Sequence, residues 1–335
     1  MLDNLKTNCI FVLFLCINSK KIRTCGSETN VYIFCNVMVL LSIRRIKYLN
    51  FNCIHKMAKS TFEYVKTFEI NDALLPNTWI VIRIDGKCFH KFAEDHNFSK
   101  PNDLRALKLM NYSAFTVFKE FDDLLLAFGQ SDEYSFVFKK HSTLYKRRAS
   151  KLLTTVNSKF SSSYVFYWNK YFGDQELKYP PTFDGRVILY PSEENLVDYM
   201  KWRQADVHIN NLYNTAFWNL VLQGKLTPSQ AEKRLCGTVS ADKNEILFKE
   251  FNINYNNEPA IFRRGTLLIR KTTANEKLGK TTKVIVDIHD DMLKDKFWKE
   301  HSVVLLDKCP KHSLLYEGPI TEIILEQLSA KNNGT

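Results

Sequence analysis

The chain has 335 residues, of which 45% are hydrophobic and 25% are charged, and its formal net charge is +11. This balance is typical of a globular protein and excludes a disordered, collagen-like or coiled-coil chain as a description of the whole. The eight cysteines include no C-x-x-C pair, so neither a disulfide framework nor a zinc module is expected. The basic excess favours a polyanionic partner without identifying one.

The first 56 residues differ in character from the rest. They hold five of the eight cysteines and eight basic against two acidic residues, so they carry +6 of the total charge. Two apolar runs, 9–17 and 31–43, are shorter than the roughly 20 residues that cross a bilayer, and stable membrane insertion is not expected. Three explanations stay open: an organelle presequence, a short membrane anchor, and sequence upstream of a true start at Met57.

From Met57 onward, the hydrophobic periodicity predicts alternating strands and helices. The predicted elements are a strand at 79–84, a helix that opens at 101–103, a hairpin of strands at 124–128 and 134–138, a helix at about 146–171 and a strand at 184–190. Their β-α-β-β-α-β order is typical of ferredoxin-like α/β (α+β) sheets. We therefore expect residues 57–190 to form a sheet domain that serves as the catalytic region.

Residues 191–301 are predicted to form an added helical part with extra strands. Thr227 begins a capping box with proline at the first helical position, and Asp242 to Glu245 has a similar Asp-x-x-Glu pattern. Two strand candidates follow, at 261–270 and 283–288. Because no low-complexity linker separates this part from the sheet, we expect it to pack on the sheet. Residues 302–335 form a tail without an assigned role.

Two carboxylates stand at the ends of predicted neighbouring strands. In a ferredoxin-like sheet the first and third strands are central neighbours, so Asp85 and Asp132 are expected to come together. Paired carboxylates suit Mg²⁺, which binds through one or two carboxylates plus substrate phosphates. Two such ions about 4 Å apart would clamp the oxygens of a phosphoryl displacement, with the Gly86 carbonyl as another ligand. The competing interpretation is a pair of ordinary polar turns.

Other phosphoryl-transfer classes are not favoured. The chain has no G-x-x-x-x-G-K-[ST] loop, which argues against a P-loop ATPase, and Arg83-Ile84-Asp85 lacks the second aspartate of a haloacid-dehalogenase phosphatase.

Long motifs around these carboxylates resemble one known family. They are RIDGKCFHKF (83–92), GQSDEYSF (129–136), YPPTFDGR (179–186), HINNLYNT (208–215), ADKNEILF (241–248) and FNINYNN (251–257). Together they resemble the tRNA-His guanylyltransferase family of 3′-5′ nucleotidyltransferases, from about Met57 to about His301. One departure is Lys87, where the family carries arginine, so a point charge replaces a bidentate fork.

The resemblance implies a polymerase-type palm sheet and the addition of one GMP to the 5′ end of histidine tRNA. ATP would adenylylate the 5′-phosphate, the GTP 3′-hydroxyl would displace AMP, and pyrophosphate would then be removed. Two Mg²⁺ ions would be held by Asp85, Gly86 and Asp132, with Glu133 either in the metal shell or behind it. The implied nucleotide-binding residues are Asp85, Gly86, Lys87, Cys88, Phe89, His90, Ser131 and Asp132.

Two further sets of residues are candidates for contact with tRNA. The first is a basic run without acidic residues, placed after the hairpin: Lys139, Lys140, Lys146, Arg147, Arg148 and Lys151. The second consists of amide, imidazole and lysine side chains that the family associates with tRNA recognition: His208, Asn210, Asn211, Asn214, Lys243 and Asn244. Helical spacing places Asn210 and Asn214 on one face. A solvated face and a helix-packing network are the competing interpretations.

The resemblance also implies a homo-oligomer, commonly a tetramer. The expected compartment is the cytoplasm, the nucleus or both, with mitochondria as a further candidate. Two alternative functions stay open: templated 3′-5′ repair of truncated tRNA 5′ ends, and non-catalytic tRNA binding.

Overall fold

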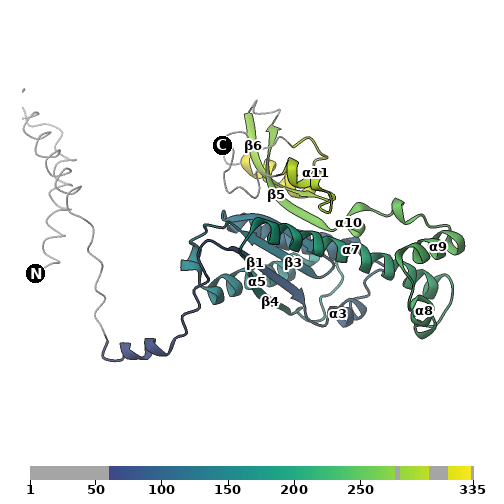
Figure 1. Ribbon diagram of the computed structural model, residues 1–335, viewed down its shortest axis with the longest axis horizontal. Coiled ribbons are helices and arrows are strands. Elements are labelled where there is room, and N and C mark those ends of the chain that lie inside the picture. Colours follow the sequence, from purple (N-terminus) through teal and green to yellow (C-terminus); the bar gives the residue numbers. More distant parts are fainter. Residues whose placement is uncertain (1–59, 276–279, 302–315, 333–335) are drawn as a thin grey trace, which may run out of the picture. The chain divides into compact units, whose positions relative to one another are not determined.

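The computed structural model describes residues 60–275, 280–301 and 316–332 (Figure 1). The chain divides into two compact units, residues 1–70 and 71–335. The described part of the first unit contains a 3-10 helix, η1 (Glu63–Phe68). The three explanations for the first 56 residues concern a segment outside the described residues. In the described ranges, no helix combines the length and the apolar character that a membrane span requires.

The second unit is built on a six-stranded antiparallel sheet with the order β4-β1-β3-β2-β5-β6. Its strands are β1 (Trp79–Gly86), β2 (Leu124–Gln130), β3 (Glu133–Phe138), β4 (Phe183–Tyr190), β5 (Thr266–Asn275) and β6 (Lys280–Ile288). The first four confirm the ferredoxin-like prediction, with β1 and β3 as central neighbours. β5 and β6 extend the same sheet beyond β2, so the extra strands of the later part belong to the palm sheet.

Helices follow the strands in the predicted alternation. They are α3 (Phe89–Asp95), α4 (Leu104–Glu120), α5 (Ala149–Phe166), α6 (Trp168–Phe172), α7 (Glu193–Leu222), α8 (Pro228–Leu235), α9 (Ser240–Phe251), α10 (Ala260–Arg264), α11 (Asp295–Glu300) and α13 (Glu322–Asn332), with 3-10 turns η2 (Leu144–Arg147) and η3 (Tyr255–Asn257).

The alternation of side chains along β1 builds a core on each face of the sheet. Ile80, Ile82 and Ile84 pack with α4 and α5, whereas Trp79 and Val81 pack with α7. β1 is apolar on both faces because helices cover both. This burial fixes the position of the strand end at Asp85 and Gly86.

α7 is the longest of the described helices and connects two cores (Figure 1). Its 30 residues span about 45 Å. Leu196 and Met200 pack on the sheet, and Leu212 and Leu220 pack with α8 and α9. The helical part therefore packs on the sheet, as expected.

Several predicted boundaries need correction. The helix expected at 146–171 is divided into η2, α5 and α6, with a break at Tyr167. The strand expected from Ile261 begins at Thr266, because residues 260–264 form α10 and Gly265 has a φ of +72°.

The caps also differ in part. The capping box at Thr227 is confirmed. Asp242 is not the residue that begins its helix, because it lies one turn inside α9 and its carboxylate accepts a hydrogen bond from the Val239 N–H. Helix α3 was not predicted, since its seven residues are too few to show a clear periodicity.

Candidate active site

The ends of β1 and β3 bring Asp85 and Asp132 together, as the topology predicts. Asp85 lies opposite Glu133 on β3 and opposite Asp184 on β4. The Gly86 N–H donates to the Asp132 carbonyl at 3.1 Å, which closes the hairpin tip against β1. Ser131, at the tip, has a φ of +48°. The strand ends thus place two carboxylates within electrostatic reach of each other.

Gly86 allows this close approach. A Cβ at Gly86 would lie 2.9 Å from Asp132 Oδ2 and 2.2 Å from the Phe89 ring. Any larger residue would therefore displace the carboxylate or the ring.

Burial and like charge destabilise the ionised aspartates. Burial, followed by the neighbouring Asp85 charge, raises the pKa of Asp132 to about 6. The pKa of Asp85 is also raised, first by burial and then by the Asp184 charge. A cation at this site would relieve both effects.

The donor set fits Mg²⁺. Asp85, Asp132 and the Gly86 carbonyl are oxygen donors of the kind that hard cations prefer. Among the described residues, no group of three or more His, Cys, Asp or Glu side chains is arranged to hold a metal ion. Two carboxylates alone match the usual Mg²⁺ pattern, in which waters and substrate phosphates complete the octahedron.

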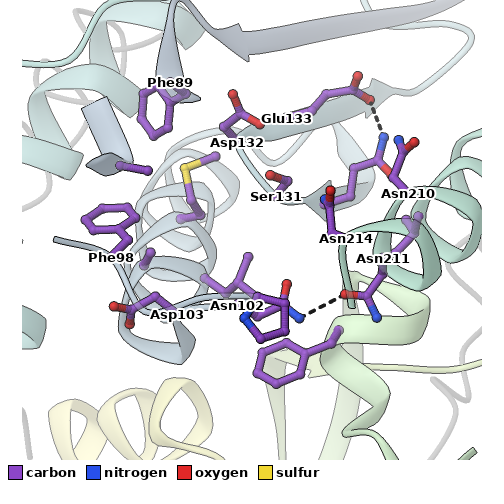
Figure 2. A pocket seen from close by; sticks show the side chains of 18 of the residues that line it. Phe89, Phe98, Asn102, Asp103, Ser131, Asp132, Glu133, Asn210, Asn211 and Asn214 are labelled. Carbon is purple, nitrogen blue, oxygen red and sulfur yellow. Dashed lines mark hydrogen bonds between the residues drawn. The ribbon is translucent and has the colours of Figure 1, made fainter. Parts of the chain in front are cut away.

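A pocket of about 700 Å³ opens beside these carboxylates. Figure 2 shows Ser131 and Asp132 between two walls, with Phe89, Phe98 and Asp103 on one side and Asn210, Asn211 and Asn214 of α7 on the other. Asn102 Nδ2 donates to Asn211 Oδ1 at 2.9 Å and joins the walls. The pocket is large enough for a nucleotide and carries aromatic and polar groups suited to a base and a sugar.

Glu133 occupies a different position from the two aspartates. The residue is 8% exposed, and its Oε2 accepts a hydrogen bond from Arg203 Nη1 at 2.8 Å. Arg83 Nε lies 3.9 Å from the same oxygen. Of the two alternatives left by the sequence, this geometry favours Glu133 behind the metal shell.

The predicted nucleotide-binding residues divide into two groups. Asp85, Phe89, His90, Ser131 and Asp132 line the pocket, and Phe89 is buried against Phe92, Tyr164 and Phe183. Gly86, Lys87 and Cys88 do not line it. Lys87 and Cys88 are exposed where β1 passes into α3, and the Lys87 N–H donates to Thr182 O at 2.8 Å.

The basic run is only partly available to RNA. Lys146 and Lys151 are exposed and Lys140 is half-buried. Lys139 forms an ion pair with Asp123 at 3.9 Å, and Arg148 forms one with Asp72 at 3.0 Å.

The prediction for Arg147 needs correction. Its guanidinium is buried and donates to the carbonyl oxygens of Leu74, Leu75, Thr78, Lys140 and Ser142 and to the Thr78 hydroxyl. A side chain whose donors are used internally fastens the preceding loop and cannot bind an RNA phosphate.

The polar residues of α7 that line the pocket divide into two groups by exposure. Asn210 and Asn214 are exposed, so their shared face is confirmed. Asn211 also lines the pocket but needs correction as a tRNA contact, because it is 6% exposed, accepts from Asn102 and donates from Nδ2 to the Tyr255 hydroxyl at 2.9 Å. It belongs to a helix-packing network.

The remaining candidates for tRNA contact lie further along the helical part. His208 is half-buried beside Tyr255, and burial lowers its pKa, with Arg263 contributing in the same direction. Lys243 Nζ donates to the Thr238 carbonyl and hydroxyl oxygens, both at 2.8 Å. Asn244 is exposed on α9.

The sequence reasoning missed several pocket residues. Lys100, Asn102, Phe217, Trp218 and Phe262 line it, although no motif pointed to them. Asp103 was identified only as a helix start, and it does cap α4 by accepting from the Arg105 N–H.

Comparisons with known proteins agree with the motifs. Residues 62–191 match the family model "tRNAHis guanylyltransferase", and residues 194–308 match the model "Thg1 C terminal domain". A Drosophila melanogaster protein named "Probable tRNA(His) guanylyltransferase" is 56% identical over 280 residues, covering 83% of this chain and 96% of the relative. A human protein of the same name is 54% identical, covering 80% and 95%.

Solved structures share the fold. The crystal structure of tRNA(His) guanylyltransferase from Saccharomyces cerevisiae is 50% identical, with a TM-score of 0.60 over 62% of this chain and 92% of that chain. A bacterial tRNA(His) guanylyltransferase-like protein in complex with ATP is 21% identical, with a TM-score of 0.59 over 74% and 99%. With both family models matched in order, the chain belongs to the tRNA(His) guanylyltransferase family and is a nucleotidyltransferase.

Proposed function

We propose that this protein adds a single GMP to the 5′ end of histidine tRNA, with ATP and GTP as substrates and two Mg²⁺ ions. The observation that carries the proposal is the Asp85 and Asp132 pair in the lining of a nucleotide-sized pocket. Named relatives support the tRNA substrate, and bacterial relatives in complex with ATP and with GTP support the nucleotides.

The reaction has three steps. An oxygen of the tRNA 5′-phosphate attacks the α-phosphorus of ATP and releases pyrophosphate. The GTP 3′-hydroxyl then attacks the activated 5′-phosphorus, losing its proton and releasing AMP. Water finally attacks the α-phosphorus of the added guanylate's triphosphate, which breaks the bond to the β-phosphate and releases pyrophosphate.

The chain's own residues position the reactants, which is most of what phosphoryl transfer requires. Asp85, Asp132 and the Gly86 carbonyl would hold the Mg²⁺ ions, which neutralise phosphate charge when bound. His90 and Ser131 line the pocket beside these carboxylates and would orient the triphosphate. Asn210 and Asn214 face the same pocket from α7, where their amides can hydrogen-bond exposed RNA groups.

The test is an assay of the purified protein with labelled 5′-monophosphorylated histidine tRNA, ATP, GTP and Mg²⁺. We expect a product one nucleotide longer that requires both nucleotides. If no such product forms while circular dichroism shows a folded protein and Mg²⁺ has been titrated, the proposal fails.

The same assay separates the alternatives. A tRNA truncated at its 5′ end and bearing another anticodon would be extended by several complementary nucleotides if the protein were a templated repair enzyme. Binding without any product would indicate a non-catalytic tRNA-binding protein. The homo-oligomer and the compartment stay predictions, the first of which light scattering would test.

A further inference from the structure

A buried ion network lies directly behind the strand end that carries Asp132. Arg203 of α7 is 5% exposed, and its Nη1 donates to Glu133 Oε2 at 2.8 Å. Its Nη2 lies 3.4 Å from Asp206 Oδ2, one turn further along the helix. The Arg203 guanidinium also stacks on the Trp202 ring at 3.6 Å. Arg203 therefore has a fixed orientation, set by contacts on three sides.

This network joins α7 to three strands. Glu133 is the first residue of β3 and follows Asp132 directly, while Arg83 of β1 approaches the same carboxylate at 3.9 Å. Gln130, the last residue of β2, lies between Glu133 Oε1 at 3.4 Å and Asp206 Oδ2 at 3.5 Å. Arg203 is the cation that connects α7 to both flanks of the hairpin tip.

The Arg203–Glu133 contact also affects the pocket, because Arg203 lies on the same side of α7 as residues that line it. Asp206, Asn210 and Asn214 follow it at intervals of three and four residues, so all four side chains lie along one stripe of the helix. Asp206, Asn210 and Asn214 line the pocket. Asn210 is about 10 Å along the axis from Arg203, so a small rotation of α7 at Arg203 would move the whole pocket wall.

A contribution to folding stability does not by itself explain the buried ion network around Arg203. The Nε atoms of Arg83 and Arg203 are buried and have no hydrogen-bond partner among the residues that the structure describes. Burying an ion pair costs desolvation free energy that its attraction often fails to recover. A network of this kind is better explained by the geometry that it imposes.

We propose that Arg203 is a positioning residue for nucleotide addition. Through Glu133 it sets the α7 wall, with Asn210 and Asn214, at a fixed place relative to the carboxylates Asp85 and Asp132. In the Arg203–Glu133 ion pair, Glu133 is the residue that belongs to the sheet, which explains why its carboxylate faces α7. The inference rests on the proposed function and adds a residue that the sequence motifs did not contain.

The test compares two arginine variants with a matched control on the same helix. Arg203→Met removes the ion pair with Glu133. Arg203→Lys keeps the positive charge but loses the guanidinium that contacts Glu133 and Asp206 through two nitrogens. Lys201→Met is the control, because Lys201 pairs with Asp295 at the same 2.8 Å but on the exposed side of α7. Each variant is assayed at least 15 °C below its own melting temperature, so that unfolding does not contribute.

We expect Arg203→Met to lower kcat at least tenfold with less than a threefold change in the Kd for tRNA, and Arg203→Lys to lower kcat severalfold with little change in melting temperature. Lys201→Met should stay within twofold of wild type. A structural role would change the melting temperature without this kcat-specific loss at matched stability.

A double-mutant cycle with Glu133→Gln identifies the partner. Because each single variant leaves one buried charge without its 2.8 Å partner, the Arg203→Met/Glu133→Gln double variant should lose less activity than the product of the two single losses. Strict multiplicativity, or an Arg203→Met kcat within twofold of wild type, would overturn the proposal. A wild-type protein without any nucleotide addition would instead defeat the proposed function.

Discussion

Polar side chains gather in two regions, the strand end around Asp132 and the helical region around Asn211. The two regions differ in whether these side chains have partners within the protein. The side-chain oxygen and nitrogen of Asn211 each have a hydrogen-bond partner in the protein. The Lys243 ammonium donates two hydrogen bonds to Thr238. Asp132 is half-buried beside another carboxylate, and its pKa is raised to about 6. The difference shows that a polar group paired within the fold serves packing, whereas a partly buried charge next to a like charge marks a ligand site.

The largest expected effect is at the strand end. Asp132→Ala and Asp85→Ala should each reduce nucleotide addition by more than a thousandfold, because either change removes a predicted metal ligand. The Kd for tRNA should stay within severalfold of wild type, measured by filter binding.

Asp184→Asn is the matched control for this pair. Asp184 lies opposite Asp85 but is exposed and pairs with Arg186 at 3.3 Å, so its loss should cost less than threefold. Retained turnover in either alanine variant would remove that carboxylate from the proposed metal site.

Arg147 should behave as a structural residue despite its place in the basic run. Arg147→Met leaves five backbone carbonyl groups without the guanidinium that donates to them and should lower the free energy of unfolding by about 3 kcal/mol, measured by urea denaturation. Lys146→Met, at an exposed neighbour, should leave stability within about 0.5 kcal/mol. Equal stability of the two variants would contradict the correction made for Arg147.

The two faces of α7 offer a sharper contrast. Asn211→Ala should lower the free energy of unfolding by about 2 kcal/mol, since it leaves Asn102 and the Tyr255 hydroxyl without their partner. Asn214→Ala, on the exposed pocket wall, should leave the melting temperature nearly unchanged and reduce nucleotide addition about tenfold. If Asn214→Ala destabilised the protein as much as Asn211→Ala, the division of α7 into two faces would be wrong.

The smallest effect concerns the charge of Asp132 itself. Its folded-state pKa of about 6 lies above the ordinary value of 3.8, so folding penalises the ionised form at high pH. With EDTA present, Asp132→Asn should stabilise the protein by about 1 kcal/mol at pH 7.5, and this gain should vanish as the pH falls toward 4.

Thermal melts across this pH range measure the effect, and Mg²⁺ should stabilise wild type but not Asp132→Asn. A gain that did not depend on pH would show that the Asp132 charge is not penalised by folding.

The local sequence determined most of the palm. The β-branched run at 79–84 is recognisable because a strand buried on both faces needs apolar residues throughout, and the topology rule then places β1 beside β3. The pairing of Asp85 with Asp132 follows from that rule alone. Motif resemblance supplied the family and the nucleotide loop, since those residues are contiguous in the chain.

Tertiary structure decided which polar side chains have partners within the protein and which are available to a ligand. Arg147 and Lys146 are adjacent and equally basic in sequence, but only the folded loop at 74–78 provides the carbonyl groups that occupy Arg147. Arg203 and Glu133 are 70 residues apart, and their contact exists only because α7 crosses the end of the sheet. Charge and periodicity are local properties of a sequence, whereas hydrogen-bond satisfaction depends on groups that the fold brings from distant positions.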